Sequence, residues 1–182
     1  MFRRTGSNGA LILVMTLVMA APIVAQNGTE TPREARANAL QDSAAALHDQ
    51  PIRYSDAARM YRESAALRSW TDARAVEALA SAAHLYNYAN RLSDARRMME
   101  QAAQRALARG DVVRASQANL DAAFFAHKQG KTVEVDRLGL AAIRLVDSPL
   151  ISEEQREVIR KRIKASPAVT AMLEQKAKVS AQ

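Results

Sequence analysis

A short segment recurs along this chain at intervals of roughly forty residues, and this recurrence restricts the fold more than any other feature. Residues 54–61 align with residues 92–99, and Ser, Asp, Ala, Arg and Met recur there in the same order. A looser third copy follows after a similar interval, where Ala122 and Arg137 correspond to Ala82 and Arg97. Periods of this length that contain two helices are typical of α-solenoids.

Glycine and proline are rare in this chain, and the stretches between them favour helix. Pro51, Gly110, Gly130, Pro149 and Pro167 separate segments rich in Ala, Leu, Arg and Glu. No segment alternates apolar and polar residues with period two, so no sheet is expected. The predicted helices run over 32–49, 55–68, 72–89, 94–109, 112–128, 133–146, 152–165 and 167–179. The expected fold is all-α, an α-α superhelix of about three helix hairpins followed by C-terminal capping helices.

Side chains that can cap helix N-termini precede several of these segments. The expected caps are Ser55 or Asp56, Thr71 or Asp72, Ser93 or Asp94, Asp111, Thr132 and Ser152. Each side-chain oxygen can accept a hydrogen bond from a backbone N–H group that the helix leaves without a partner. Gly110 and Gly130 are expected to end helices, because glycine adopts the left-handed conformation of a helix C-terminus without strain.

The copies also share an order of small and large residues. In the second copy this order reads Ala83, Tyr86, Ala95, Met99 and Ala102. It resembles the tetratricopeptide repeat (TPR), a family in which small residues let the two helices of a hairpin approach closely and large residues close the core against the next hairpin. The same positions hold, in the first and third copies, Ala45, His48, Ala57, Tyr61 and Ser64, and Ala123, Ala126, Val135, Gly139 and Ala142.

TPR-like repeats are assigned to residues 33–149, with one alternative. Both observed periods are longer than is usual in the family, and Pro149 is the one proline that closes a copy. A plain helical bundle is therefore the alternative fold. Residues 150–182 are assigned to C-terminal capping helices and a tail, because Ser152 and Gln155 can form a capping box ahead of an apolar side at Ile159 and Ile163.

The N-terminal residues predict export. Arg3 and Arg4 precede an apolar run over residues 10–21, and small residues ending at Ala25 follow it, in the order typical of a secretory signal peptide. Residues 1–25 are therefore assigned to a signal peptide and residues 26–32 to a flexible lead. The apolar run is too short to cross a bilayer as a helix, so no lasting membrane span after signal cleavage is expected, although retention as an anchor stays open. The expected location is periplasmic or secreted, and the composition is typical of a bacterial protein.

Charge and residue types argue against several classes of function. The 26 basic and 19 acidic residues alternate along the chain, which gives no stripe for nucleic acid. Cysteine is absent, so disulfides and thiolate chemistry are excluded. His48, His84 and His127 lack a second ligand at a metal-binding spacing, and His48 is expected to pack between helices. The carboxylates are interpreted as surface ion pairs with Arg or Lys within a helical turn. We therefore expect neither an enzyme nor a cofactor or metal.

The TPR resemblance implies a concave groove lined by the first helix of each hairpin. The residues carried over to groove-facing positions are Asp42, Glu77, His84, Asn87, Tyr88, Gln117, Phe124, His127 and Lys128. Aromatic and hydrogen-bonding groups of this kind suit an extended or helical peptide, so the implied function is a binding or scaffolding module with a protein or peptide partner. Recognition of a terminal carboxylate is not implied, because Ala80 and His84 replace the lysine and asparagine that some members use for it.

Some alternatives stay open. Tyr88 and Phe124 fit the core as well as the groove, and since Phe124 and Phe125 are adjacent, one can be buried while the other faces the groove. Residues 151–156 are similar to the L-T-x-x-Q element of helical periplasmic chaperones and stress sensors, which is the alternative function. An enzyme with an unrecognised site is a second alternative. The sequence also leaves homodimerisation undecided.

Overall fold

The computed structural model describes residues 30–180, and within that range all regular structure is helical. The α-helices are α1 (Pro32–Ala46), α2 (Tyr54–Leu67), α3 (Ala73–Tyr88), α4 (Leu92–Ala108), α5 (Val112–Lys128), α6 (Thr132–Arg144), α7 (Glu153–Lys164) and α8 (Pro167–Ser180). Short 3-10 turns, η1 (Pro51–Arg53) and η2 (Leu145–Asp147), precede α2 and follow α6. The all-α prediction is confirmed, and no helix end differs from its predicted position by more than three residues. The predicted signal peptide, residues 1–25, lies outside the described residues.

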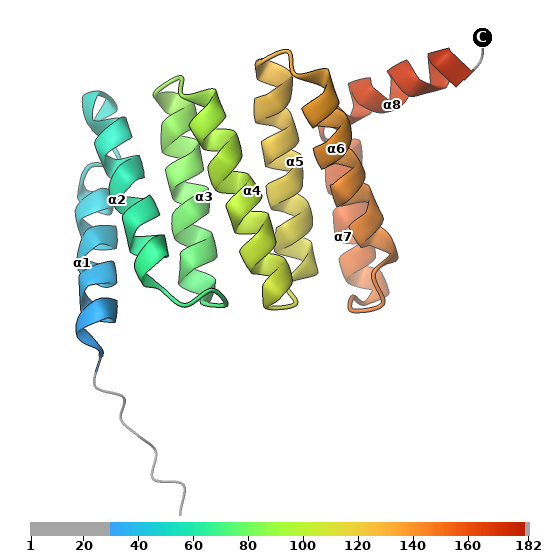
Figure 1. The fold of residues 1–182 in the computed structure, drawn as a ribbon. Helices are drawn as coiled ribbons and strands as arrows, with labels where there is room; N and C mark the ends of the chain where they lie inside the picture. The colour runs from blue at the N-terminus through green and yellow to red at the C-terminus, as the bar shows by residue number, and fades with distance from the viewer. Residues whose placement is uncertain (1–29, 181–182) are drawn as a thin grey trace, which may run out of the picture.

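The first six helices run antiparallel to their neighbours in the chain and pack side by side in chain order (Figure 1). From α1 to α6 they form one row, in which each helix contacts the helix before it and the helix after it. Beyond this row, α7 packs against α5, and α8 packs against both α5 and α6. The chain therefore forms an all-α superhelix whose last two helices cover its C-terminal end.

The turns that end α3, α4 and α5 share one geometry. Asn90, Gly110 and Gly130 have positive φ angles of 56°, 78° and 68°. In each turn the next residue donates its N–H to a carbonyl five residues earlier, at N–O distances of 2.7, 2.9 and 3.0 Å, as in a Schellman motif. The roles predicted for Gly110 and Gly130 are confirmed. Asn90 aligns with Gly130 at the interval of forty residues, but no such role is predicted for it from the sequence. Because the three turns are evenly spaced along the chain, the structural unit is one helix with its turn.

Each of the first six helices buries residues at two positions seven residues apart. The pairs are Ala37 and Ala44, Ala57 and Ser64, Ala75 and Ala82, Ala95 and Ala102, Ala115 and Ala122, and Val135 and Ala142. Seven residues are about two helical turns, so both members of a pair lie on the same face. Their small size lets neighbouring backbones approach, and the Ser64 hydroxyl donates across this seam to the Ala37 carbonyl at 2.7 Å.

The pattern predicted for the first copy is wrong at two positions. Ala44 rather than Ala45 is buried, and His48 is exposed instead of packed between helices. His48 follows the last residue of α1, Ala46, and therefore lies in a turn. Three successive alanines at 44–46 give no period that could show which of them faces the core. The patterned residues of the second and third copies are all buried.

Helix N-termini follow the predicted caps in only part of the chain. Three predicted caps accept a backbone N–H as expected: Asp72, Asp111 and Ser152. The helices α2 and α4 begin before their predicted caps, and α6 begins at its predicted cap, Thr132, so that Lys131 occupies the N-cap position. Asp56 and Asp94 instead lie in the first turn, where their carboxylates accept hydrogen bonds from Arg53 and Arg91 at 2.8 Å and lie at the positive end of the helix dipole.

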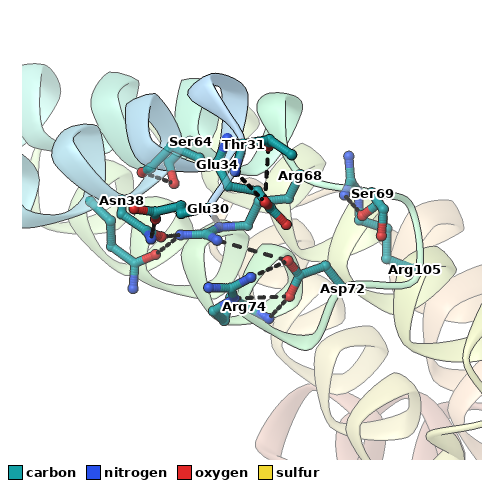
Figure 2. Close-up of polar contacts among 12 residues, drawn as sticks. Glu30, Thr31, Glu34, Asn38, Ser64, Arg68, Ser69, Asp72, Arg74 and Arg105 are labelled. Atoms are coloured by element: carbon teal, nitrogen blue, oxygen red, sulfur yellow. Dashed lines mark hydrogen bonds and ion pairs between the residues drawn. The ribbon is translucent and has the colours of Figure 1, made fainter. Parts of the chain in front are cut away.

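A buried arginine joins α1, α2 and α3 at one end of the row (Figure 2). The Arg68 guanidinium donates to the side-chain oxygens of Asn38 and Gln41 at 2.5 and 2.9 Å, and it lies 3.8 Å from the Asp72 carboxylate. Asp72 also caps α3 by accepting the Arg74 backbone N–H at 2.8 Å. Burial alone would raise the pKa of Asp72, but hydrogen bonds from Arg74 and the charges of Arg74 and Arg68 lower that pKa below its usual value.

The last helix closes the row over α6. Ala168, Val169 and Met172 of α8 are buried. A Cβ atom added to Gly139 of α6 would lie 3.2 Å from the Met172 sulfur and from a methyl carbon of Val169. Glycine at this position therefore gives α8 the room to lie directly on α6.

Candidate binding cleft

An open cleft of about 680 Å³ lies between α3, α5 and α7. Its walls include Val76, Glu77, Ala80, Ser81 and His84 of α3, Val113, Arg114, Gln117, Ala118 and Asp121 of α5, and Gln155, Val158 and Arg162 of α7. The same cleft is lined by Met99 and Ala102 of α4 and by Asp111 before α5. The helices α3 and α5 occupy equivalent places in successive hairpins and run in the same direction (Figure 1). Residues spaced three or four apart on each of them line the cleft.

The cleft walls combine apolar surface with polar groups that already have partners. Three valines, Val76, Val113 and Val158, provide the β-branched apolar surface, and 41% of the Val158 surface is exposed. The Arg114 guanidinium donates to the Glu77 carboxylate at 3.0 Å, which links α5 to α3. The Arg162 guanidinium donates to the Gln117 amide oxygen, which links α7 to α5.

Asp121 differs from Glu77 and Asp111, the two other carboxylates of the walls, which both lie within ion-pair distance of Arg114. The Asp121 side chain is partly buried, and it makes no hydrogen bond or ion pair with any residue in the described range 30–180. Burial raises the pKa of Asp121, and the electrostatic influence of His84 and Arg162 opposes this rise without cancelling it. The cleft therefore contains a carboxyl group for which the rest of the described chain supplies no direct partner.

A second pocket of about 270 Å³ extends the cleft toward the C-terminal end of α5. The two hollows share Gln117, Asp121 and Arg162, and Phe124 and Leu120 line the extension together with residues 165–167. We call the cleft and this extension the groove. Eleven residues of α5 separate Val113 from Phe124, so the groove follows the helix for about 16 Å. An extended peptide of about five residues has this length.

The structure brings four of the nine predicted groove residues to the groove, Glu77, His84, Gln117 and Phe124. Three more lie together near the C-terminal ends of α3 and α5. There the Lys128 ammonium donates to the Asn87 amide oxygen at 2.9 Å and lies 5.7 Å from the centre of the Phe124 ring. Tyr88 packs against Tyr54, with 5.5 Å between ring centres.

The two remaining predicted residues are exposed but do not line the groove. Asp42 lies on α1, at the opposite end of the row, and His127 lies near the end of α5. The structure also shows which of the aromatic side chains are exposed and which lie in the core. Tyr88 is 62% exposed and Phe124 is 38% exposed, whereas Phe125 is buried.

Sequence reasoning missed Asp121 and the whole contribution of α7. The expected pairing of each carboxylate with an Arg or Lys within a helical turn is wrong for Asp121, because neither residue type occurs within four positions of it. Asp42 is the other acidic residue with no Arg or Lys within four positions. This property therefore limits the candidates for an unpaired carboxylate to two residues, but it does not locate the cleft. No sequence feature indicates that Val158 and Arg162 line a cleft, because the pattern of residues 152–165 predicts only a terminal capping helix.

Two further findings concern residues 30–180 as a whole. Within this range no three His, Asp or Glu side chains come close enough together to hold a metal ion. None of the helices in the same range has both the length and the apolar character needed to cross a membrane.

Comparisons of this chain with protein-family models and with curated proteins give no match.

The raised pKa of Asp121 predicts how stability depends on pH. A carboxyl group whose pKa is raised by folding binds protons more tightly in the native state, so its ionisation destabilises the fold as the pH rises through the folded pKa. We expect Asp121→Asn to have a higher thermal midpoint than the wild type near neutral pH. The difference should disappear below about pH 3.8, where the carboxyl group becomes protonated in both states.

Thermal unfolding followed by circular dichroism at several pH values measures this difference. Asp49→Asn, in the exposed turn after α1, is the matched control and should follow the wild type. A lower midpoint for Asp121→Asn at neutral pH would contradict the expectation.

Proposed function

We propose that this chain is an exported binding module of the TPR type, which holds a segment of another polypeptide in the groove. Support for the TPR assignment comes from the small residues that recur on the buried face of each helix, together with the side-by-side packing of antiparallel hairpins. Support for export comes from the order of charged, apolar and small residues within positions 1–25.

The observation that carries the binding proposal is the groove itself. It follows the first helices of two successive hairpins, and α7 forms its third wall. Valine side chains offer apolar contact, while Gln117, Gln155 and Ser81 offer hydrogen bonds that can fix a peptide backbone. An exposed aromatic ring, that of Phe124, lies at one end as a rigid contact surface.

Selection from a library of random seven-residue peptides tests this proposal. We expect the exported protein to enrich a family of related peptides. Ser81→Trp, which places an indole ring in the cleft, should reduce their affinity at least about tenfold, since a filled cleft excludes the ligand. Fluorescence anisotropy of labelled peptides provides the affinities.

Ser43→Trp is the control for the change in residue type, because Ser43 is exposed on α1 and does not line the groove. It should bind as the wild type does. Glu77→Trp, at an exposed position on the same wall as Ser81, repeats the test if Ser81→Trp lowers the thermal midpoint. Failure to enrich any peptide, or unchanged binding by the folded cleft variants, would refute the proposed function.

A further inference from the structure

We infer that the peptide held in the groove presents a lysine or arginine side chain to Asp121. This inference rests on the proposed function and adds the chemistry by which the groove selects its ligand. Three observations support it. They are the charges that line the cleft, the position of Asp121 along the groove, and the contacts that the nearby guanidinium groups already make within the chain.

Among residues 30–180, two charged groups that line the cleft have no partner of opposite charge within ion-pair distance, Asp121 and Arg162, and Arg162 is hydrogen-bonded to the neutral Gln117 amide. The carboxylates are Glu77, Asp111 and Asp121, and the guanidinium groups are Arg114 and Arg162. Arg114 lies between two of the carboxylates, 3.0 Å from Glu77 and 3.6 Å from Asp111. A partly buried carboxylate without a partner is unfavourable, so a cation brought by a ligand gains a strong interaction at this point.

The position of Asp121 favours a side chain within a peptide over a terminal amine. Asp121 lines both the cleft and its extension, so the groove continues in both directions from it. Val113 and Val158 lie on the cleft side and Phe124 on the other. A bound peptide therefore has room for apolar residues before and after the basic one.

An acidic peptide fits the groove less well. Arg162 is the guanidinium that lines both hollows with Asp121, and it is held by its hydrogen bond to Gln117. Arg114 is held by two carboxylates. A ligand carboxylate beside Asp121 would meet a like charge, and the two guanidinium groups of the cleft already donate to Gln117 and Glu77. The imidazole of His84, on the opposite wall of the cleft, can form a hydrogen bond with a bound peptide.

The peptides enriched by the selection described above provide the probes. We expect one position in them to be lysine or arginine. The strongest binder is then synthesised together with an analogue in which norleucine replaces a lysine or citrulline replaces an arginine, which removes the charge while keeping the aliphatic part of the side chain. We expect the wild-type protein to bind the analogue about tenfold to a hundredfold more weakly, as is typical when a charged hydrogen bond is lost.

The protein variants complete a double-mutant cycle. Asp121→Asn should bind the charged peptide as weakly as the wild type binds the analogue, and it should no longer distinguish the two peptides. Asp42→Asn is the matched control, because Asp42 is the other acidic residue without an Arg or Lys within four positions and lies outside the groove. It should distinguish the peptides as the wild type does.

Failure of the inference can be told apart from failure of the proposed function. If peptides bind and Ser81→Trp abolishes binding, but no basic residue is enriched or Asp121→Asn still distinguishes the two peptides, the inference is overturned and the binding function stands. If no peptide is enriched, the proposed function fails and the inference fails with it.

Discussion

Replacing Ala95 by leucine is expected to destabilise the protein by about 1–3 kcal/mol, which lowers its thermal midpoint by several degrees. Ala95 has no exposed surface, and it occupies the position at which each of the first six helices buries a small or β-branched residue. The added carbon atoms have no free space to enter, so the neighbouring helices must move apart. Thermal unfolding of the purified protein, followed by circular dichroism, provides the measurement.

A leucine at an exposed alanine of the same helix isolates the effect of packing. Ala108 is the last residue of α4 and is exposed, so Ala108→Leu should leave the midpoint within about a degree of the wild type. Equal midpoints for Ala95→Leu and Ala108→Leu would show that the buried small residues do not determine the spacing of the helices.

Replacing Asp72 by alanine is expected to cost about 2–4 kcal/mol, because two stabilising contributions are lost together. The Asp72 carboxylate caps α3 through the Arg74 N–H, and it is also the counter-charge nearest to the buried Arg68 guanidinium. Without it, Arg68 keeps only the neutral side chains of Asn38 and Gln41 as partners. Urea unfolding near neutral pH measures the loss of free energy.

Asp72→Asn separates the cap from the charge. Asparagine caps helices about as well as aspartate, so this variant should lose clearly less stability than Asp72→Ala. Because folding lowers the pKa of Asp72, the contribution of its charge is present above the unfolded pKa and is lost as the pH falls through the folded pKa. The gap between wild type and Asp72→Asn should therefore close in strong acid. Equal losses for both variants at neutral pH would exclude a capping contribution.

The helices could be predicted because their ends carry chemical signals. Gly110 and Gly130 mark two turns through the backbone conformation that glycine permits, and residues 112–128 match α5 at both ends. Asn90 forms the same turn without being recognised, since asparagine also occurs in many other settings. The unit of one helix with its turn was hidden for a different reason. Alanine occupies nearly every buried small position and also covers exposed ones such as Ala45 and Ala108, so only the longer periods marked by Ser, Asp and Arg were visible.

The groove could be predicted only where it follows the repeat. Glu77, His84 and Gln117 line it because equivalent positions of successive first helices face the same side. The third wall depends on how α7 folds back against α5 after η2, and this is a contact between distant segments that no local pattern specifies. Asp121 could not be singled out for the same reason. Whether its carboxyl group has a hydrogen-bond or ion-pair partner depends on which residues lie near it in the folded chain.

The two ends of the row differ, and this difference determines how the fold comes apart. Each helix from α1 to α6 packs chiefly on its chain neighbours, so the stability of the row is close to a sum of adjoining interfaces. At one end α8 lies across α6, whereas at the other α1 packs mainly against α2. A pulling force applied to the N-terminus therefore detaches α1 first and the following helices in succession. Under such a load we expect the protein to lengthen in steps, one for each interface between adjoining helices.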